Sequence, residues 1–127
     1  MAIQTFRDLV VWQRGMELAR RVYAESQVMP RDEIFGLTSQ MRRAANSIPL
    51  NIAEGYGKHS RPELVRGLRI ATGSLMELMT AWELAVSLKM VPECQELLDL
   101  MREEDRLLSS MIRKLEAKPE ANRRTTQ

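Results

Sequence analysis

The side chains that most often carry catalysis or bind metals are scarce in this sequence. It contains one cysteine, Cys94, and one histidine, His59. A disulfide within the chain, a thiolate zinc site and a histidine-based metal cluster each need more of these residues. A pair of a nucleophile and a histidine is also unsupported, because His59 lies in a turn-like segment, GKHSRP. We therefore expect no metal, no cofactor and no enzymatic activity.

A second group with chemical potential is a ridge of polar residues at helical spacing. Their positions increase by three or four residues, so a helix places them on one flank of its apolar stripe. The ridge consists of Gln40, Arg43, Ser47, Asn51 and Glu54, with Pro49 and Gly55 close by in the same segment. We interpret it as a structural or subunit contact, or as a set of donors for carbonyls freed by Pro49. The alternatives are a ligand contact and, with less support, an enzyme site built on Asn51 and Glu54.

Glu54 raises a question of charge within this ridge. It falls in the last turn of the expected helix, where the helix dipole disfavours a negative charge. We expect an arginine partner for its carboxylate. The candidates are Arg43, Arg61, Arg66 or a residue of a neighbouring subunit.

Basic residues are concentrated in the middle of the chain. Between residues 42 and 69 there are six lysines and arginines against two acidic residues, a net charge of +4 in a chain whose total is +2. The six are Arg42, Arg43, Lys58, Arg61, Arg66 and Arg69. Arginine carries a planar fork of donors that suits phosphate. The cluster predicts a surface that binds nucleic-acid backbone, and the alternative is a plain solvated surface.

The elements that must position these residues are four helices. Apolar residues recur at three- and four-residue spacing over about residues 9–28, 33–56, 62–89 and 93–117. The short connections favour an all-α, antiparallel up-down-up-down four-helix bundle in one domain, residues 1–117. Residues 118–127 lack apolar periodicity, which predicts a disordered tail. With no membrane-spanning apolar run and no secretion signal, we expect a cytoplasmic protein without membrane contact.

Local signals set the expected start and face of the first and third helices. Asp8 is the expected N-cap of the first helix, and Ser60, followed by Pro62 and Glu63, that of the third. The first helix is expected to turn one main apolar stripe to the core. That stripe is Leu9, Trp12, Met16, Ala19 and Tyr23, widened by Val11, Leu18 and Val22.

The second helix contains a proline in its interior. Its apolar stripe keeps the same phase through Ile48 and Ile52 on either side of Pro49. We therefore expect the helix to continue across Pro49 with a kink, because proline removes one amide hydrogen bond and crowds a preceding carbonyl. Gly55 and Gly57 are expected to end it.

Three segments of the chain carry a resemblance to a known family. They are FRDLVVWQRGMELA, DEIFGLTSQMRRAANSIPLNIAEGYGKHS and LRIATGSLMEL, with LTSQ, SIPLNIAEG and ATGSLMEL the most specific motifs. Over nearly all of residues 5–117 the chain resembles the bacterial four-helix-bundle family first noticed in intervening sequences of large-subunit ribosomal RNA genes. The resemblance implies a left-turning antiparallel bundle and a ring-shaped homopentamer. It implies little about activity.

The family pattern falls on the ridge and on one segment of the third helix. The matched positions are Leu37, Gln40, Arg42, Arg43, Ser47, Pro49, Asn51, Ala53, Glu54, Gly55, Gly73, Ser74, Leu75 and Glu77, whereas Leu50 departs from the small residue expected there. A related group, the accessory proteins of diversity-generating retroelements, forms pentameric four-helix barrels that bind nucleic acid and a reverse transcriptase. That role reaches this chain by analogy of fold.

A ring would explain an unusual feature of the helix at 62–89. This helix carries an unbroken heptad series from Leu64 to Ala85 and a second apolar stripe beside it. The second stripe is Val65, Met76, Met79 and Val86. One stripe is expected to face the core and the other the next subunit.

These observations lead to one favoured function and one alternative. The favoured one is a non-enzymatic homo-oligomeric adaptor that binds nucleic-acid backbone through arginines repeated around a ring, and that docks a nucleic-acid enzyme such as a reverse transcriptase. The chain shows no run of aromatic residues of the kind that stacks bases, so we expect no base recognition. The alternative is a scaffold that binds only protein.

Overall fold

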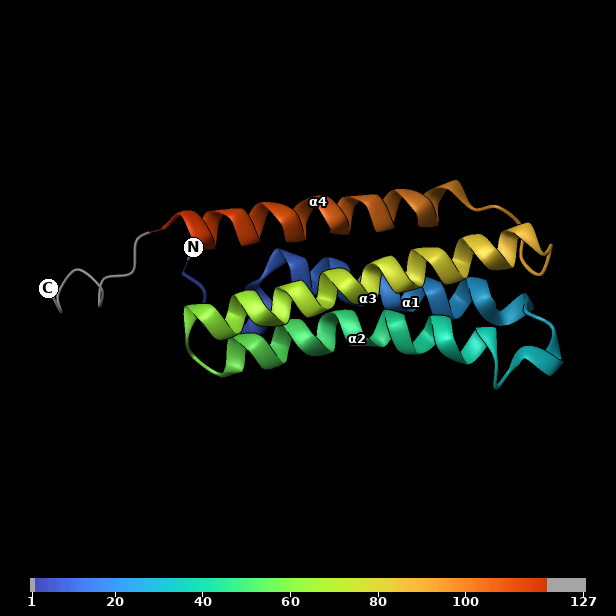
Figure 1. Ribbon diagram of the computed structural model, residues 1–127, viewed down its shortest axis with the longest axis horizontal. Helices are drawn as coiled ribbons and strands as arrows, with labels where there is room; N and C mark the ends of the chain where they lie inside the picture. The colour runs from blue at the N-terminus through green and yellow to red at the C-terminus, as the bar shows by residue number, and fades with distance from the viewer. Residues whose placement is uncertain (1, 119–127) are drawn as a thin grey trace, which may run out of the picture.

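The protein is built from helices alone over the range that the computed structural model describes, residues 2–118. The four α-helices are α1 (Val10–Glu25), α2 (Leu37–Gly57), α3 (Arg61–Ser87) and α4 (Gln95–Ala117). Three short 3₁₀ turns flank the first two: η1 (Phe6–Asp8), η2 (Ser26–Val28) and η3 (Arg31–Glu33). Figure 1 shows the helices side by side, with the colour order reversing direction in successive helices. The all-α prediction is confirmed.

Two further predictions concern the C-terminal tail and membrane-spanning helices. The tail expected at 118–127 lies outside the described residues apart from Lys118. Across residues 2–118, none of the helices combines the length and apolar character that crossing a membrane requires.

Asp8 does not cap α1, contrary to the sequence prediction. Its carboxylate instead accepts hydrogen bonds from the backbone N–H groups of Gln4 (2.8 Å) and Thr5 (3.1 Å), which closes a capping box around η1. These two bonds hold the pKa of Asp8 below its usual range. The N-cap position of α1 belongs to Leu9, which has no side-chain acceptor. Asp8 therefore fixes the turn before α1.

The face of α1 that lies in the core is the one the sequence pattern treated as secondary. The buried residues of α1 are Val11, Gly15, Leu18 and Val22. Trp12, Met16 and Ala19 are only half-buried and Tyr23 is exposed, because these side chains line a surface hollow between α1 and α2. Gly15 allows α1 to approach α2 closely, since a Cβ there would lie 3.2 Å from Ile48 Cγ2. The predicted stripe is therefore confirmed at Leu9 and at its widening residues Val11, Leu18 and Val22, whereas the side chains at its expected centre lie at the edge of the core.

The second helix starts later than the expected residue 33. Residues 31–33 form η3, and the Glu33 carboxylate accepts the backbone N–H of Leu37 at 2.9 Å. This bond satisfies one of the free amides at the start of α2. From there the helix runs through Pro49 to Gly57, so its predicted continuation across the proline is confirmed.

The helix α2 ends at Gly57, as predicted, but neither predicted glycine supplies the left-handed residue that follows it. His59 adopts the left-handed conformation, with φ of 58°, and its N–H donates to the carbonyl of Tyr56 at 3.1 Å. Lys89 takes the same conformation after α3, with φ of 61°. Within residues 2–118 no glycine has positive φ. The predicted role of Gly55 as part of the helix end is therefore wrong.

Gly55 instead brings α2 and α3 into direct backbone contact. It is buried within α2, and a Cβ added to it would lie 2.9 Å from the carbonyl oxygen of Glu63. Opposite, a Cβ on Gly67 would lie 2.5 Å from the carbonyl oxygen of Asn51. Only glycine fits at both positions, because any side chain would separate the two backbones. Figure 1 shows these halves of α2 and α3 lying against each other.

The third helix begins and packs largely as predicted. Ser60 is its N-cap and accepts the backbone N–H of Glu63 at 3.2 Å. The heptad series is buried over Leu68, Ala71, Leu75, Leu78, Trp82 and Ala85. The second stripe is not: Met76 is 41% exposed, and Met79 and Val86 are half-buried. The four helices of one chain thus cover one stripe of α3 and leave the other open.

Candidate functional site

The central part of the polar ridge forms a hydrogen-bonded seam between α2 and α3. Ser47 Oγ lies 2.7 Å from Ser74 Oγ on α3. Asn51 Nδ2 donates to Ser47 Oγ and to the Ser47 carbonyl, both at 2.8 Å. The Asn51 amide is therefore committed to positioning Ser47 across from Ser74. This seam lies two turns from the Gly55–Gly67 contact and holds the same helix pair together.

The other members of the ridge lie apart from this seam. Gln40 lies near the start of α2, where it lines a surface hollow with Phe35, Leu84 and Leu88. Pro49 and Gly55 are buried. Glu54 is exposed and forms no ion pair within residues 2–118, so none of the arginine partners expected for it is found in the described chain. The ridge is thus one seam with separate flanking residues.

The six basic residues of the predicted cluster fall into two groups. Arg42 and Arg43 lie near the start of α2, and Lys58 follows its end, about 24 Å further along the helix axis. Arg42 is held by its own chain: Nε donates to Ser26 Oγ at 2.9 Å, and the guanidinium lies 5.0 Å from the centre of the Tyr23 ring. Arg43 is exposed beside Phe35. These two arginines do not share a surface with the other four.

The remaining four lie where α2 ends and α3 begins. The Lys58 ammonium is 3.9 Å from the Glu63 carboxylate, Arg61 donates to the carbonyl of Lys118, and Arg69 pairs with Glu116. Arg66 is exposed and makes no ion pair with any described residue. The contacts of Arg61 and Arg69 bring the end of α4 to the same place.

The end of α4 adds cations that sequence reasoning missed. Arg113 and Lys114 are exposed in the last turns of α4, and Arg113 lines the same shallow hollow as Arg69 and Glu116. Their basic character was visible in the sequence, but their place beside residues 58–69 depends on α4 returning along α3. Figure 1 shows the end of α4 next to the start of α3.

The charges of the chain are therefore divided between the two ends of the molecule. Residues 54–72 and 106–118 carry eight lysines and arginines against three acidic residues, a net charge of +5. Residues 20–40 and 77–99, at the opposite end, carry four against eight, a net charge of −4. We call the first the basic end and define it by Lys58, Arg61, Arg66, Arg69, Arg113 and Lys114. Such a surface attracts polyanions and the opposite end repels them.

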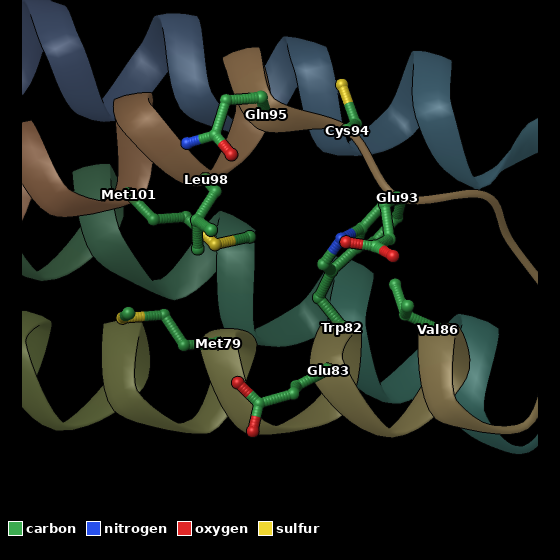
Figure 2. Close-up of a pocket in the computed structure, with 9 residues that line it drawn as sticks. All are labelled: Met79, Trp82, Glu83, Val86, Glu93, Cys94, Gln95, Leu98 and Met101. Atoms are coloured by element: carbon green, nitrogen blue, oxygen red, sulfur yellow. The ribbon is translucent and has the colours of Figure 1, made fainter.

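At the acidic end a hollow of about 350 Å³ opens between α3 and α4. Figure 2 shows Trp82 and Val86 of α3 on one side and Leu98 and Met101 of α4 on the other. The acidic side chains of Glu83 and Glu93 also line it. The Cys94 thiol points away from Trp82 in this view, and Arg21 Nη2 lies 3.9 Å from its sulfur. Cys94 and His59 are too far apart in the fold to act together, since His59 precedes the start of α3 and Cys94 follows its end.

A buried carboxyl group lies in the core of the bundle. Glu104 of α4 is fully buried, and neither of its carboxylate oxygens has a hydrogen-bond partner in the described chain. A Cβ added to Gly15 of α1 would lie 3.1 Å from Oε2, so the missing side chain makes the space that this carboxyl occupies. Burial raises the pKa of Glu104 to about 8; the charge of Glu103 adds to the rise, and that of Arg14 opposes it. The group is thus mostly neutral at pH 7.

The sequence analysis missed Glu104, although its spacing carried a signal. It stands in phase with Leu97, Met101 and Leu108, which are all buried. An acidic residue on the apolar stripe of a helix indicates a buried polar group. Within residues 2–118 no three His, Cys, Asp or Glu side chains are grouped so as to hold a metal ion.

Comparison with known proteins gives one clear result. A family model described as 23S rRNA-intervening sequence protein matches residues 7–113, which include α1, α2, α3 and most of α4. The resemblance carried by the LTSQ, SIPLNIAEG and ATGSLMEL motifs is therefore confirmed. A search of curated proteins found no match.

Proposed function

Because the chain belongs to the 23S rRNA-intervening sequence protein family, we propose that it is a non-enzymatic homo-oligomeric adaptor that binds nucleic-acid backbone. The basic end carries this proposal. Its cations come from three separate places in the sequence, and Arg66, Arg113 and Lys114 are exposed without an ion pair among residues 2–118. Unpaired cations gathered at one end of the bundle can bind phosphate without first losing an internal partner.

The proposed binding is independent of sequence. Contacts from arginine and lysine to phosphate position a nucleic acid without reading its bases. The aromatic residues Phe6, Trp12 and Tyr23 line the hollow between α1 and α2, and Trp82 is buried. Tyr56 does lie at the basic end, beside His59, but its ring is half-buried against the core and is a single ring, whereas single-strand binders stack successive bases on several. We therefore expect RNA and DNA of any sequence to bind through charge.

The proposed assembly is a ring of up-down-up-down bundles, with a homopentamer favoured by the family resemblance. A ring repeats the basic end once in each subunit, and a nucleic acid that reaches several copies gains avidity without any new contact. The acidic end is then free for a protein partner. A reverse transcriptase is the partner that the likeness to retroelement accessory proteins suggests, and a cytoplasmic location is part of this proposal.

The experiment is a binding titration with matched charge variants. We would measure the fluorescence anisotropy of labelled single-stranded RNA, single-stranded DNA and duplex DNA with the wild-type protein. The variant R66E/R113E/K114E changes three exposed cations of the basic end. The control R20E/R31E/R102E makes the same change in charge at exposed positions outside it. We expect the first to lose on the order of 100-fold in affinity at 0.1 M salt and the second to lose far less. Equal losses, or no binding by the wild type, would overturn the proposal.

A protein-only scaffold is the second candidate, and one observation favours it. Phe35 is 94% exposed beside the exposed Leu84 and Leu88, a surface more typical of a protein contact than of solvent. A pull-down from a cell extract with and without nuclease separates the two functions. Partners that all survive the nuclease favour the scaffold, and partners lost with the nucleic acid favour the adaptor.

A further inference from the structure

Phe35 is the most exposed large apolar residue of the described chain. It stands between η3 and α2 with 94% of its surface open to solvent. Leu84 and Leu88 of α3, which are 47% and 54% exposed, line the same shallow hollow, as does Arg43. We call Phe35, Arg43, Leu84 and Leu88 the Phe35 surface. An aromatic ring held at such exposure on a short turn is suited to insertion into a partner.

A hollow that would accept such a ring exists elsewhere on the same molecule. It is the opening between α3 and α4 shown in Figure 2, lined by Met79, Trp82, Val86, Leu98 and Met101. We call it the Trp82 hollow. Its volume of about 350 Å³ is left because no side chain of the described chain fills it. Its floor includes Met79 and Val86, two members of the second apolar stripe of α3.

We infer that the Phe35 surface of one copy docks into the Trp82 hollow of a second copy of this chain. The inference rests on the proposed function, which requires an oligomer, and identifies the two surfaces that build it. The aromatic ring would enter the apolar floor of the hollow, and Leu84 and Leu88 would cover its edge. Residues that are exposed in one chain would then be buried in the pair.

Charge supports this choice of occupant. Arg43 lines the hollow of the Phe35 surface and Lys89 directly follows Leu88 in the chain; both are exposed. Glu83 and Glu93 line the Trp82 hollow and are exposed. None of these four side chains forms an ion pair within residues 2–118. Glu33 also lines the hollow beside Phe35, but its carboxylate accepts the backbone N–H of Leu37. Unlike charges would therefore meet across the contact, which fixes its orientation.

The two surfaces also lie at the same level along the molecule. Leu84 precedes Val86 by two residues on α3, and Leu88, the C-cap of that helix, follows it by two, so the last turn of α3 serves both surfaces. Residues 84 and 88 point to one flank of α3 and residues 79 and 86 to the other, given about 100° for each residue. Copies with aligned axes can therefore join side by side. The contact uses two different patches, and repeating it closes a ring where the rotation allows.

The test uses the fact that such a contact has two unlike halves. F35E removes one half, and E83R/E93R disables the other; all three positions are exposed, and circular dichroism verifies folding. Sedimentation velocity would then be measured on each protein alone and on an equimolar mixture. We expect an oligomeric wild type, two monomeric variants, and a mixture that forms a 1:1 dimer. The dimer cannot grow, because each variant supplies only one working half.

A cross-linking experiment gives an independent readout. With Cys94 changed to serine, a chain carrying F35C and E93C and treated with a short bis-maleimide should give a ladder of dimers, trimers and longer products. Each single-cysteine chain should give no product beyond a dimer, and L50C with E93C serves as the control pair, because Leu50 is 66% exposed on α2 away from both surfaces. The longest product in the ladder reports the ring number.

Each contrary outcome has a distinct meaning. A wild type that is monomeric at all concentrations overturns both this contact and the oligomeric part of the proposed function, whereas nucleic-acid binding is measured separately. A variant F35E that remains as oligomeric as the wild type overturns this contact alone. A mixture of the two variants that stays monomeric, or grows beyond a dimer, also overturns it.

Discussion

Changing Glu104 to glutamine should alter the pH dependence of stability in a specific way. The Glu104 carboxyl is fully buried without a partner, and its pKa is about 8 in the folded chain against an ordinary value of 4.5. Below pH 4.5 the group is protonated in both the folded and the unfolded chain. Above that pH the unfolded chain loses the proton while the folded chain keeps it, so folding requires proton uptake.

The size of the effect follows from the two pKa values. The free energy of unfolding should fall by about 1.4 kcal/mol for each pH unit between 4.5 and 8, on account of this group alone. Between pH 4.5 and pH 7 the free energy of unfolding should therefore fall by about 3 kcal/mol through this group, a large part of the stability of a small domain. Glutamine resembles the neutral carboxyl in shape and does not titrate, so E104Q should escape this cost.

The assay is urea unfolding of the wild type and E104Q at pH 4.5, 6, 7 and 8, followed by circular dichroism at one protein concentration. The difference between the two proteins isolates Glu104, because all other groups titrate alike in both. We expect nearly equal stability at pH 4.5 and an advantage of E104Q that grows with pH. E77Q is the matched control, since Glu77 is exposed on α3 and forms no ion pair within residues 2–118. A difference between wild type and E104Q that does not change with pH would refute the reasoning.

Three further predictions concern single residues and are measured by the same unfolding experiment at pH 7. Gly67→Ala should lower the free energy of unfolding by about 2 kcal/mol or more, because the new Cβ would lie 2.5 Å from the Asn51 carbonyl oxygen. Gly73→Ala should raise it by about 1 kcal/mol, since nothing lies within 4 Å of that Cβ and alanine is the better helix former. Similar values for the two variants would contradict the close α2–α3 contact. His59→Gly should stabilise by about 1 kcal/mol, because the residue has φ of 58°, and an unchanged or lower stability would count against that conformation. Ser74→Ala should cost about 1 kcal/mol through loss of its bond to Ser47, and a neutral effect would argue against the seam.

The helices themselves were predictable because each carries an apolar repeat that a short chain must bury. Periodicity placed α3 and α4 within two residues of their observed starts. It also carried α2 across Pro49, since the stripe keeps its phase on both sides. On the first helix it gave the element and the buried residues Val11, Leu18 and Val22 but misplaced the centre of the stripe, because Trp12 lies at the edge of the core and the smaller Gly15 is buried. Residue size misleads where close packing of backbones decides which face is buried.

The candidate site was less predictable, because it depends on which helices lie together. The sequence grouped Arg42 and Arg43 with Arg66 by their nearness along the chain. The fold separates them by most of a helix and brings Arg113 to Arg69 instead. The left-handed residue after α2 was also missed, since His59 replaces the glycine that such a position favours. Both the grouping of the cations and the conformation of His59 depend on contacts between helices, which the order of residues along the chain does not give.

The salt dependence of nucleic-acid affinity tests the central claim most directly. For the wild type, the logarithm of the binding constant should fall linearly with the logarithm of salt concentration, with a slope of about −0.9 for each phosphate contact on a duplex. For R66E/R113E/K114E the slope should be shallower by about 2 to 3 for each subunit that contacts the duplex. R20E/R31E/R102E should keep the wild-type slope. A slope that R66E/R113E/K114E leaves unchanged would contradict the assignment of the basic end as the nucleic-acid surface.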